Sequence, residues 1–280
     1  MEQMKICVRG LGPVGLPTAA MIALGGHQVV GYDPDPSIAR SLRDGAQRID
    51  DPSVRAIVLE ALASGRLRLS DGQPEGAEAY LLCVPAPLVE GRPDLSYLQA
   101  ALRDLAPHVR RGDLVIVEST LPLGTIERVV VPALRAVGVD PDEIAIAYCP
   151  DRASDGGIVE ELTRGERLIG GRKAGDAERA RLLYASFCSG TFHLTDSVSA
   201  ELTKFAADAF RAVNLAFANE LAELAAQVGS DAQEVIALAN REPHVAIVAP
   251  RPTVDTQVVR ITVDPLDGRI APLMLAASSL

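Results

Sequence analysis

Near the start of the sequence stands Gly10-Leu11-Gly12-Pro13-Val14-Gly15, whose glycines have the spacing of a turn that joins a strand to a helix. A mostly apolar run, Lys5–Val8, precedes it, and a helical pattern follows over residues 13–25. A second strand-like run, Gln28–Tyr32, ends directly before Asp33. This order of strand, glycine turn, helix, strand and acidic residue predicts a βαβ unit that binds a dinucleotide.

Each glycine of this turn has a separate task. Gly10 permits the tight turn, Gly12 lets the backbone approach a pyrophosphate, and Gly15 lets the helix pack on the strand. The free N–H groups at the start of the helix favour phosphate. Asp33, about 20 residues beyond Gly12, is expected to accept hydrogen bonds from the ribose hydroxyls of adenosine. A carboxylate there repels a 2′-phosphate, so we expect NAD rather than NADP as the cofactor.

The chain beyond this unit continues to alternate apolar strand-like runs with helical patterns. The further strand-like runs are Arg66–Leu69, Tyr80–Val84, Leu114–Val117, Ile144–Ala147, Leu168–Ile169 and Phe192–Leu194. Helical patterns occupy residues 36–43, 53–63, 95–108, 125–137 and 176–188. Continuous apolar strands between helices predict an α/β fold, a Rossmann-like doubly wound parallel sheet with helices on both faces.

The pattern changes near residue 196. Ser197–Val228 contains neither Gly nor Pro and predicts one long helix, capped by Asp196 or Ser197 and ended by Gly229. A second helix is expected over Asp231–Asn240, and the proline-rich remainder predicts a short irregular tail. We therefore expect an NAD-binding domain over 1–195, a central helical region for dimerisation and substrate over 196–242, and the tail over 243–280.

Composition excludes several classes of function. Lys and Arg number 27 against 37 Asp and Glu, which gives a net charge of −10, and no basic cluster exceeds Arg110-Arg111, so no nucleic-acid partner is expected. No signal peptide and no apolar stretch of 18 residues occurs, so no membrane is expected. Four dispersed cysteines predict buried, reduced thiols in a cytoplasmic protein, and the scattered histidines predict no metal site.

Further blocks along the chain resemble the UDP-glucose/GDP-mannose dehydrogenase family, the NAD-dependent nucleotide-sugar dehydrogenases. The matching blocks are Gly10–Pro17, Cys83-Val84-Pro85-Ala86-Pro87, Pro93–Tyr97, Val117-Glu118-Ser119-Thr120 with Gly124-Thr125, Tyr148–Arg152, Glu201-Leu202-Thr203-Lys204, Asn214 and Asn219–Leu221. They keep the order of the family over residues 4–245. The cofactor contacts expected from the turn and these blocks are Gly10, Gly12, Pro13, Val14, Gly15, Asp33, Val84, Pro85, Glu118 and Ser119.

The resemblance implies a two-step oxidation of a primary alcohol to a carboxylate. A lysine and an asparagine hold the reacting oxygen, a cysteine captures the aldehyde, and a glutamate and a threonine-held water help hydrolyse the thioester. Lys204 and Thr120 match the lysine and the threonine. The asparagine is replaced by Asp208 and the glutamate by Asp151, so these four side chains are the catalytic candidates. In the Val-Pro-x-Pro loop, Ala86 replaces the usual threonine.

The nucleophile is the largest departure from the family. Its glycine-rich loop corresponds to residues 250–265 here, where the glycines are gone and Val258 stands about where the cysteine belongs. No cysteine follows Cys188, and Cys149 fits the sheet-end pattern of the family rather than a replacement. The chain also stops at Leu280, before the C-terminal nucleotide-sugar domain of the family. We therefore expect a shortened, divergent member.

Covalent capture of an aldehyde needs a nucleophile, which valine lacks. We therefore expect a single two-electron oxidation of a hydroxyl on a sugar, nucleoside or nucleotide. Two alternatives stay open: a redox-neutral epimerase that retains its NAD, and a non-catalytic NAD-binding paralogue. Apolar positions from Phe205 to Leu224 cover a wide arc of the long helix, which predicts a second packing surface and hence a homodimer through that helix.

Overall fold

The computed structural model describes residues 2–43, 49–71, 74–90, 92–150 and 157–251. The chain divides into two compact units. The first comprises Met1–Ala86 and Asp94–Glu201, and the second comprises Pro87–Pro93 and Leu202–Leu280. The domain limits at 195/196 and 242/243 stay a prediction, and residues 252–280 of the expected tail lie outside the described residues.

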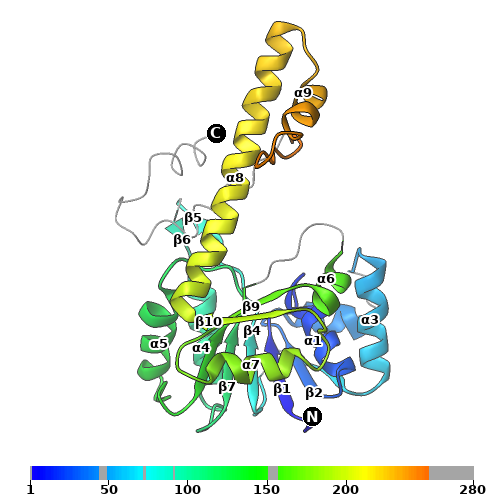
Figure 1. The fold of residues 1–280 in the computed structure, drawn as a ribbon. Coiled ribbons are helices and arrows are strands. Elements are labelled where there is room, and N and C mark those ends of the chain that lie inside the picture. Colours follow the sequence, from blue (N-terminus) through cyan, green and yellow to red (C-terminus); the bar gives the residue numbers. More distant parts are fainter. Residues whose placement is uncertain (1, 44–48, 72–73, 91, 151–156, 252–280) are drawn as a thin grey trace. The chain divides into compact units, whose positions relative to one another are not determined.

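A sheet of eight strands forms the centre of the first unit (Figure 1). The strands are β1 (Lys5–Arg9), β2 (Gln28–Tyr32), β3 (Leu67–Ser70), β4 (Ala79–Leu82), β7 (Leu114–Val117), β8 (Ala145–Tyr148), β9 (Arg167–Gly171) and β10 (Phe192–Asp196). Their spatial order is β10-β9-β8-β7-β4-β1-β2-β3. The strand order reverses between β1 and β4. Sheets of this kind bind their ligands at such a switch point, beyond the carboxyl ends of the strands.

The sheet confirms the predicted fold class, with one difference. All neighbouring strands pair in parallel except β8 and β9, which are antiparallel. The connection between them contains α6 (Ile158–Arg164), a helix that we did not predict. An antiparallel partner starts at the edge where the previous strand ends, so the chain need not cross the sheet. Arg167, at the start of β9, therefore lies at the carboxyl edge of the sheet.

Helices cover both faces of the sheet, and each face has its own apolar core. Alternate residues of β1 point to opposite faces: Ile6 and Val8 belong to one core and Cys7 to the other. The first core is covered by α1 (Gly15–Leu24), α2 (Pro36–Arg43), α3 (Pro52–Ala63) and α7 (Asp176–Tyr184). The second core is covered by α4 (Ser96–Leu105) and α5 (Val131–Ala136). Burial of each large apolar side chain stabilises this arrangement by about 1.5–3 kcal/mol.

A single π-helical turn, η1 (Ile126–Val130), precedes α5. Pro132 explains it, because proline has no N–H group and its ring collides with the carbonyl four residues earlier. The helix widens instead, and the Val131 N–H bonds to the Ile126 carbonyl, five residues back. The prediction of a helix over residues 125–137 is confirmed, but the periodicity did not indicate the π turn.

The second unit contains most of the long helix α8 (Ser197–Val228) together with α9 (Ala232–Ala239) and a two-stranded hairpin, β5 (Leu88–Val89) and β6 (Arg92–Pro93). Asp196 caps α8, because its carboxylate accepts the Ser199 N–H at 2.8 Å. Gly229 ends it with a backbone φ of +75°, a conformation that favours glycine. The predicted limits of α8 are confirmed, whereas the hairpin had no sequence signal strong enough to predict it.

Candidate active site

Among the three glycines of the turn at the end of β1, Gly12 is the one with open space beside its Cα atom. Gly10 has a φ of +95°, and a Cβ atom there would lie 2.2 Å from the Cys83 carbonyl oxygen. A Cβ on Gly15 would lie 2.0 Å from the Gly10 carbonyl oxygen. A Cβ on Gly12 would meet no atom within 4 Å. Gly10 and Gly15 are therefore required by the fold, while Gly12 faces open space of the kind that a pyrophosphate needs.

Asp33 connects this turn to the end of β2. One carboxylate oxygen accepts the Leu11 N–H at 3.0 Å and the other accepts the Asp35 N–H at 3.0 Å. Each oxygen has two lone pairs, so each has one acceptor position left. The residue is partly exposed. Asp33 thus holds the glycine turn and retains acceptor capacity, and its contact with the ribose hydroxyls stays a prediction.

The residues after β4 and β7 are joined to each other by hydrogen bonds. The Ser119 hydroxyl accepts the Val84 N–H at 2.9 Å and contacts the Leu82 carbonyl at 3.4 Å. Val84 and Ser119 are buried, whereas Pro85 is exposed. Ser119 therefore fixes the loop of Val84 and Pro85 beside the glycine turn, and its hydroxyl is engaged in that task.

Glu118 was predicted as a cofactor contact, but its side chain is buried and accepts hydrogen bonds within the protein. The Tyr184 hydroxyl donates to one carboxylate oxygen at 2.6 Å, and the Cys83 thiol donates to the other at 3.1 Å. The guanidinium of Arg167 stacks 4.6 Å from the centre of the Tyr184 ring. The carboxylate of Glu118 thus links the residue after β4 to α7, and its contact with the cofactor stays a prediction.

Cys149 lies in the same buried region, 4.0 Å from the Arg167 guanidinium. Burial raises the pKa of the Cys149 thiol to about 11, so the thiolate is scarce at neutral pH. This supports the expectation that Cys149 does not replace a catalytic cysteine. Asp151, two residues further on, and Val258 both lie outside the described residues.

Thr120 is partly exposed at the carboxyl end of β7. The segment that contains it is held by hydrogen bonds at its start and at its end. Ser119 anchors its start. Glu201 anchors its end, because its carboxylate accepts the Gly124 N–H at 2.6 Å and the Ile126 N–H at 2.9 Å. Burial raises the pKa of Glu201, against the opposing effect of these two hydrogen bonds. We did not predict a role for Glu201, although it stands three residues before Lys204 in a matching block.

Lys204 and Asp208 form a buried ion pair on α8, 3.3 Å apart. Lys204 is 8% exposed and Asp208 is 4% exposed, so they are not the exposed pair that a helix surface usually carries. The same oxygen of Asp208, Oδ1, also contacts the Arg211 guanidinium. Oδ2 of Asp208 is buried and has no hydrogen-bond partner among the described residues. Such an oxygen is unusual, because buried polar groups in folded proteins are normally hydrogen-bonded.

Three asparagines in the second unit hold an extended segment that follows α9. Asn240 exchanges two hydrogen bonds with the backbone of Ile247, at 2.8 and 2.9 Å. Asn214 binds the Ala246 carbonyl and the Val248 N–H, at 2.6 and 3.0 Å. The side-chain oxygen Oδ1 of Asn219 accepts the Arg251 N–H at 2.9 Å. These three are all the asparagines in the sequence, which is a signal that could have predicted a shared task.

Within the described residues, no cluster of three His, Cys, Asp or Glu side chains is arranged to bind a metal ion. Nor does any described helix combine the length and apolar character needed to cross a membrane.

A mostly parallel sheet with a glycine turn at its switch point and an acidic residue after β2 defines a dinucleotide-binding α/β protein. Residues 4–188 match the NAD binding domain of the UDP-glucose/GDP-mannose dehydrogenase family, and residues 198–266 match its central domain. The chain belongs to this family, and NAD is the cofactor of its N-terminal domain, as predicted. Gly12 and Asp33 fit that cofactor.

Curated relatives support this assignment. The chain is 37% identical to a UDP-N-acetyl-D-mannosamine dehydrogenase of Methanococcus aeolicus, over 92% of this chain and 59% of the relative. It is 39% identical to an NDP-N-acetyl-D-galactosaminuronic acid dehydrogenase of Ralstonia nicotianae, over 93% of this chain and 63% of the relative. The chain thus spans about three fifths of the length of the curated relatives it matches.

A solved structure agrees over nearly the whole chain. The UDP-D-ManNAc dehydrogenase of Pyrococcus horikoshii superimposes with a TM-score of 0.92 at 35% identity, and covers 99% of this chain and 68% of its own. The Cap5O UDP-N-acetyl-mannosamine dehydrogenase of Staphylococcus aureus gives a TM-score of 0.86 at 33% identity, over 98% of this chain and 66% of its own.

Proposed function

We propose that this chain is an NAD-dependent oxidoreductase that oxidises one hydroxyl group of a nucleotide sugar by a single two-electron step. The observation that carries the proposal is the buried Lys204–Asp208 pair with an unpartnered carboxylate oxygen, in a chain whose glycine turn fits NAD. The names of the relatives make a UDP-linked N-acetylated hexosamine the first substrate to test.

The proposed roles follow from the charges of the side chains. Bound NAD supplies the hydride acceptor. The Lys204 ammonium donates a hydrogen bond to the substrate oxygen and stabilises the negative charge that develops on it. Oδ2 of Asp208 accepts the hydroxyl proton, which the asparagine of the family pattern lacks the basicity to do. Thr120 binds a water molecule or a substrate hydroxyl. Asp151 stays a candidate acid or base.

The proposed limit to one oxidation step follows from the lack of a cysteine nucleophile. A second hydride can leave only after the aldehyde has been converted to a tetrahedral adduct, for which the family pattern uses a cysteine. Val258 stands about where that cysteine belongs, and no cysteine follows Cys188. The raised pKa of the Cys149 thiol makes it a poor replacement for that cysteine. The expected product is therefore an aldehyde or a ketone.

The test is a reaction of the purified chain with NAD and UDP-N-acetyl-D-mannosamine, UDP-N-acetyl-D-galactosamine or UDP-glucose. NADH is followed by absorbance and the products are identified by mass spectrometry. One NADH per substrate, with a product two mass units lighter, supports the proposal. Two NADH with a carboxylate product contradict the single step. An isomer of unchanged mass without NADH release indicates an epimerase, and NAD binding without turnover indicates a non-catalytic paralogue.

We further propose that the chain forms a homodimer through α8. Phe210 is 65% exposed and Phe217 is 52% exposed, and Leu224 continues the same seven-residue spacing. Residues seven apart lie on one side of a helix, so these side chains form an apolar stripe that a second copy would cover. We place the protein in the cytoplasm, which the four free cysteines support.

A further inference from the structure

Glu201 joins two parts of the first unit that are 75 residues or more apart in the sequence. Its side chain extends from the first turns of α8 to the start of η1. There it accepts the N–H groups of Gly124 and Ile126, two donors that the first turn of a helix leaves without a backbone partner. Glu201, on α8, therefore caps the helix that starts with η1, and a carboxylate is favoured at this positive end of the helix dipole.

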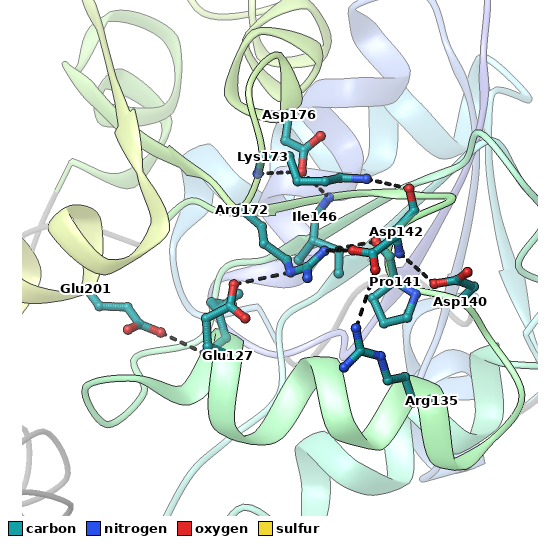
Figure 2. A network of polar contacts seen from close by, with 11 residues as sticks. Glu127, Arg135, Asp140, Pro141, Asp142, Ile146, Arg172, Lys173, Asp176 and Glu201 are labelled. Carbon is teal, nitrogen blue, oxygen red and sulfur yellow. Dashed lines mark hydrogen bonds and ion pairs between the residues drawn. The ribbon is translucent and has the colours of Figure 1, made fainter.

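The capped helix is held at further points by a polar network. Glu127, in the same π turn, accepts from the Arg172 guanidinium at 3.2 Å. Arg172 also donates to Asp142 at 2.8 Å, and Arg135, at the other end of the helix, reaches the same carboxylate at 3.4 Å. Figure 2 shows this network, with Glu201 beside the start of the helix and Asp142 beside Arg135. The helix is thus fixed at both ends, and Glu201 holds the end that follows Thr120 in the sequence.

The segment between the anchors contains the residue for which we propose a catalytic task. Ser119 holds one end of residues 120–123 against β4, and Glu201 holds the other end at Gly124. Gly124 has a φ of +80°, and the Thr125 hydroxyl donates to the Pro122 carbonyl at 2.6 Å, so the turn itself is tight. The position of Thr120 therefore depends on where Glu201 holds this turn.

We propose that Glu201 is a positioning residue, which places Thr120 for the reaction by capping the turn that follows it. This inference rests on the proposed function, in which Thr120 binds water or substrate. The same face of α8 carries Lys204 and Asp208, three and seven residues further on, so one helix face supplies both the acceptor of the hydroxyl proton and the anchor of the Thr120 segment.

The experiment compares the wild type with Glu201→Gln, and with Glu223→Gln as a matched control, since Glu223 is an exposed carboxylate on the same helix. Gln keeps the size of Glu but replaces one acceptor oxygen by an NH2 donor, which faces a backbone N–H. In Glu201→Gln we expect faster hydrogen exchange of the amides of residues 120–126. We also expect a kcat lower by about tenfold to a hundredfold, the effect of a misplaced catalytic group, with KM within about twofold.

The possible outcomes distinguish a positioning role of Glu201 from a role in the stability of the fold alone. If Glu201→Gln lowers the melting temperature strongly and abolishes NAD binding, Glu201 is only structural and the proposal is wrong. If exchange rises but kcat stays at the level of Glu223→Gln, the anchor does not serve catalysis. If the wild type binds NAD without turnover on any substrate, the proposed function fails by itself. The inference is then judged by exchange: NAD should protect residues 119–123 in the wild type and lose this effect in Glu201→Gln.

Discussion

Asp208 is the residue at which the proposed chemistry departs from the family pattern, which has an asparagine there. Its carboxylate uses Oδ1 for Lys204 and Arg211 and leaves Oδ2 without a partner among the described residues. An asparagine would present one oxygen and no negative charge. Under the proposed roles, the aspartate turns a hydrogen-bonding position beside Lys204 into a proton acceptor, and the proposed removal of the hydroxyl proton depends on this change.

Replacement of Asp208 by asparagine tests that role directly. We expect Asp208→Asn to lower kcat by about 10²–10⁴-fold, the usual contribution of a general base, with a smaller change in KM. Steady-state NADH formation measures the effect. Glu220→Gln, an exposed carboxylate on the same helix, serves as the control and should leave kcat unchanged. A kcat of wild-type size in Asp208→Asn would reduce Asp208 to an ion-pair partner of Lys204.

Substitutions of two glycines in the turn should have different effects, one on NAD binding and the other on stability. Gly12→Ala places a methyl group in open space, so we expect a melting temperature close to that of the wild type and a Kd for NAD that is higher by about tenfold or more. Gly10→Ala collides with the Cys83 carbonyl at a positive φ, so we expect a loss of about 3 kcal/mol of stability or more. Calorimetric titration and thermal denaturation distinguish them. Unchanged NAD affinity in Gly12→Ala would place the pyrophosphate elsewhere.

At the scale of elements, the extended segment after α9 is held by side chains rather than by a neighbouring strand. In a strand, the N–H and C=O groups of one residue point to the side opposite those of its neighbours. Asn240 satisfies both groups of Ile247, and Asn214 satisfies the facing groups of Ala246 and Val248. Two asparagines thus act as the two neighbours that a strand has in a sheet.

Removal of one of these amides should release the segment locally. We expect Asn240→Leu to accelerate hydrogen exchange of the Ile247 amide by about fivefold to tenfold, because a net hydrogen bond contributes about 1 kcal/mol. Gln227→Leu removes an exposed amide from α8 and should leave the exchange of Ile247 unchanged. Equal exchange in wild type and Asn240→Leu would mean that the segment is held by other contacts.

At the scale of the whole molecule, the apolar stripe on α8 predicts self-association. We expect the wild type to sediment as a dimer at micromolar concentration and Phe217→Glu to raise the Kd of the dimer by about a hundredfold or more, because burial of an unpaired charge opposes association. Leu59→Glu, which changes an exposed leucine on α3, is the control and should remain dimeric. A monomeric wild type at that concentration would contradict the proposed dimer.

The alternation of apolar strands and helices predicted the doubly wound sheet, and Ser197–Val228 predicted α8 to the residue, because these are local and periodic signals. The antiparallel β9, the short α6 and the β5–β6 hairpin were missed. The direction of a strand depends on how the connection crosses the sheet, and a helix of seven residues or strands of two give little periodic signal.

Some residues of the candidate site were predicted from the sequence, whereas the contacts of others became visible only in the structure. Gly10, Gly12, Gly15 and Asp33 were predicted from the spacing of one motif, and Lys204 and Asp208 from the resemblance to the family. By itself the sequence determined the fold class, the family and the identity of the proposed reacting groups. The tertiary structure alone decided that Glu118 is buried beneath the sheet edge, that Glu201 caps a helix 75 residues away, and that Oδ2 of Asp208 has no donor among the described residues. Burial and long-range hydrogen bonds depend on which elements pack together, and no local pattern of residues records that.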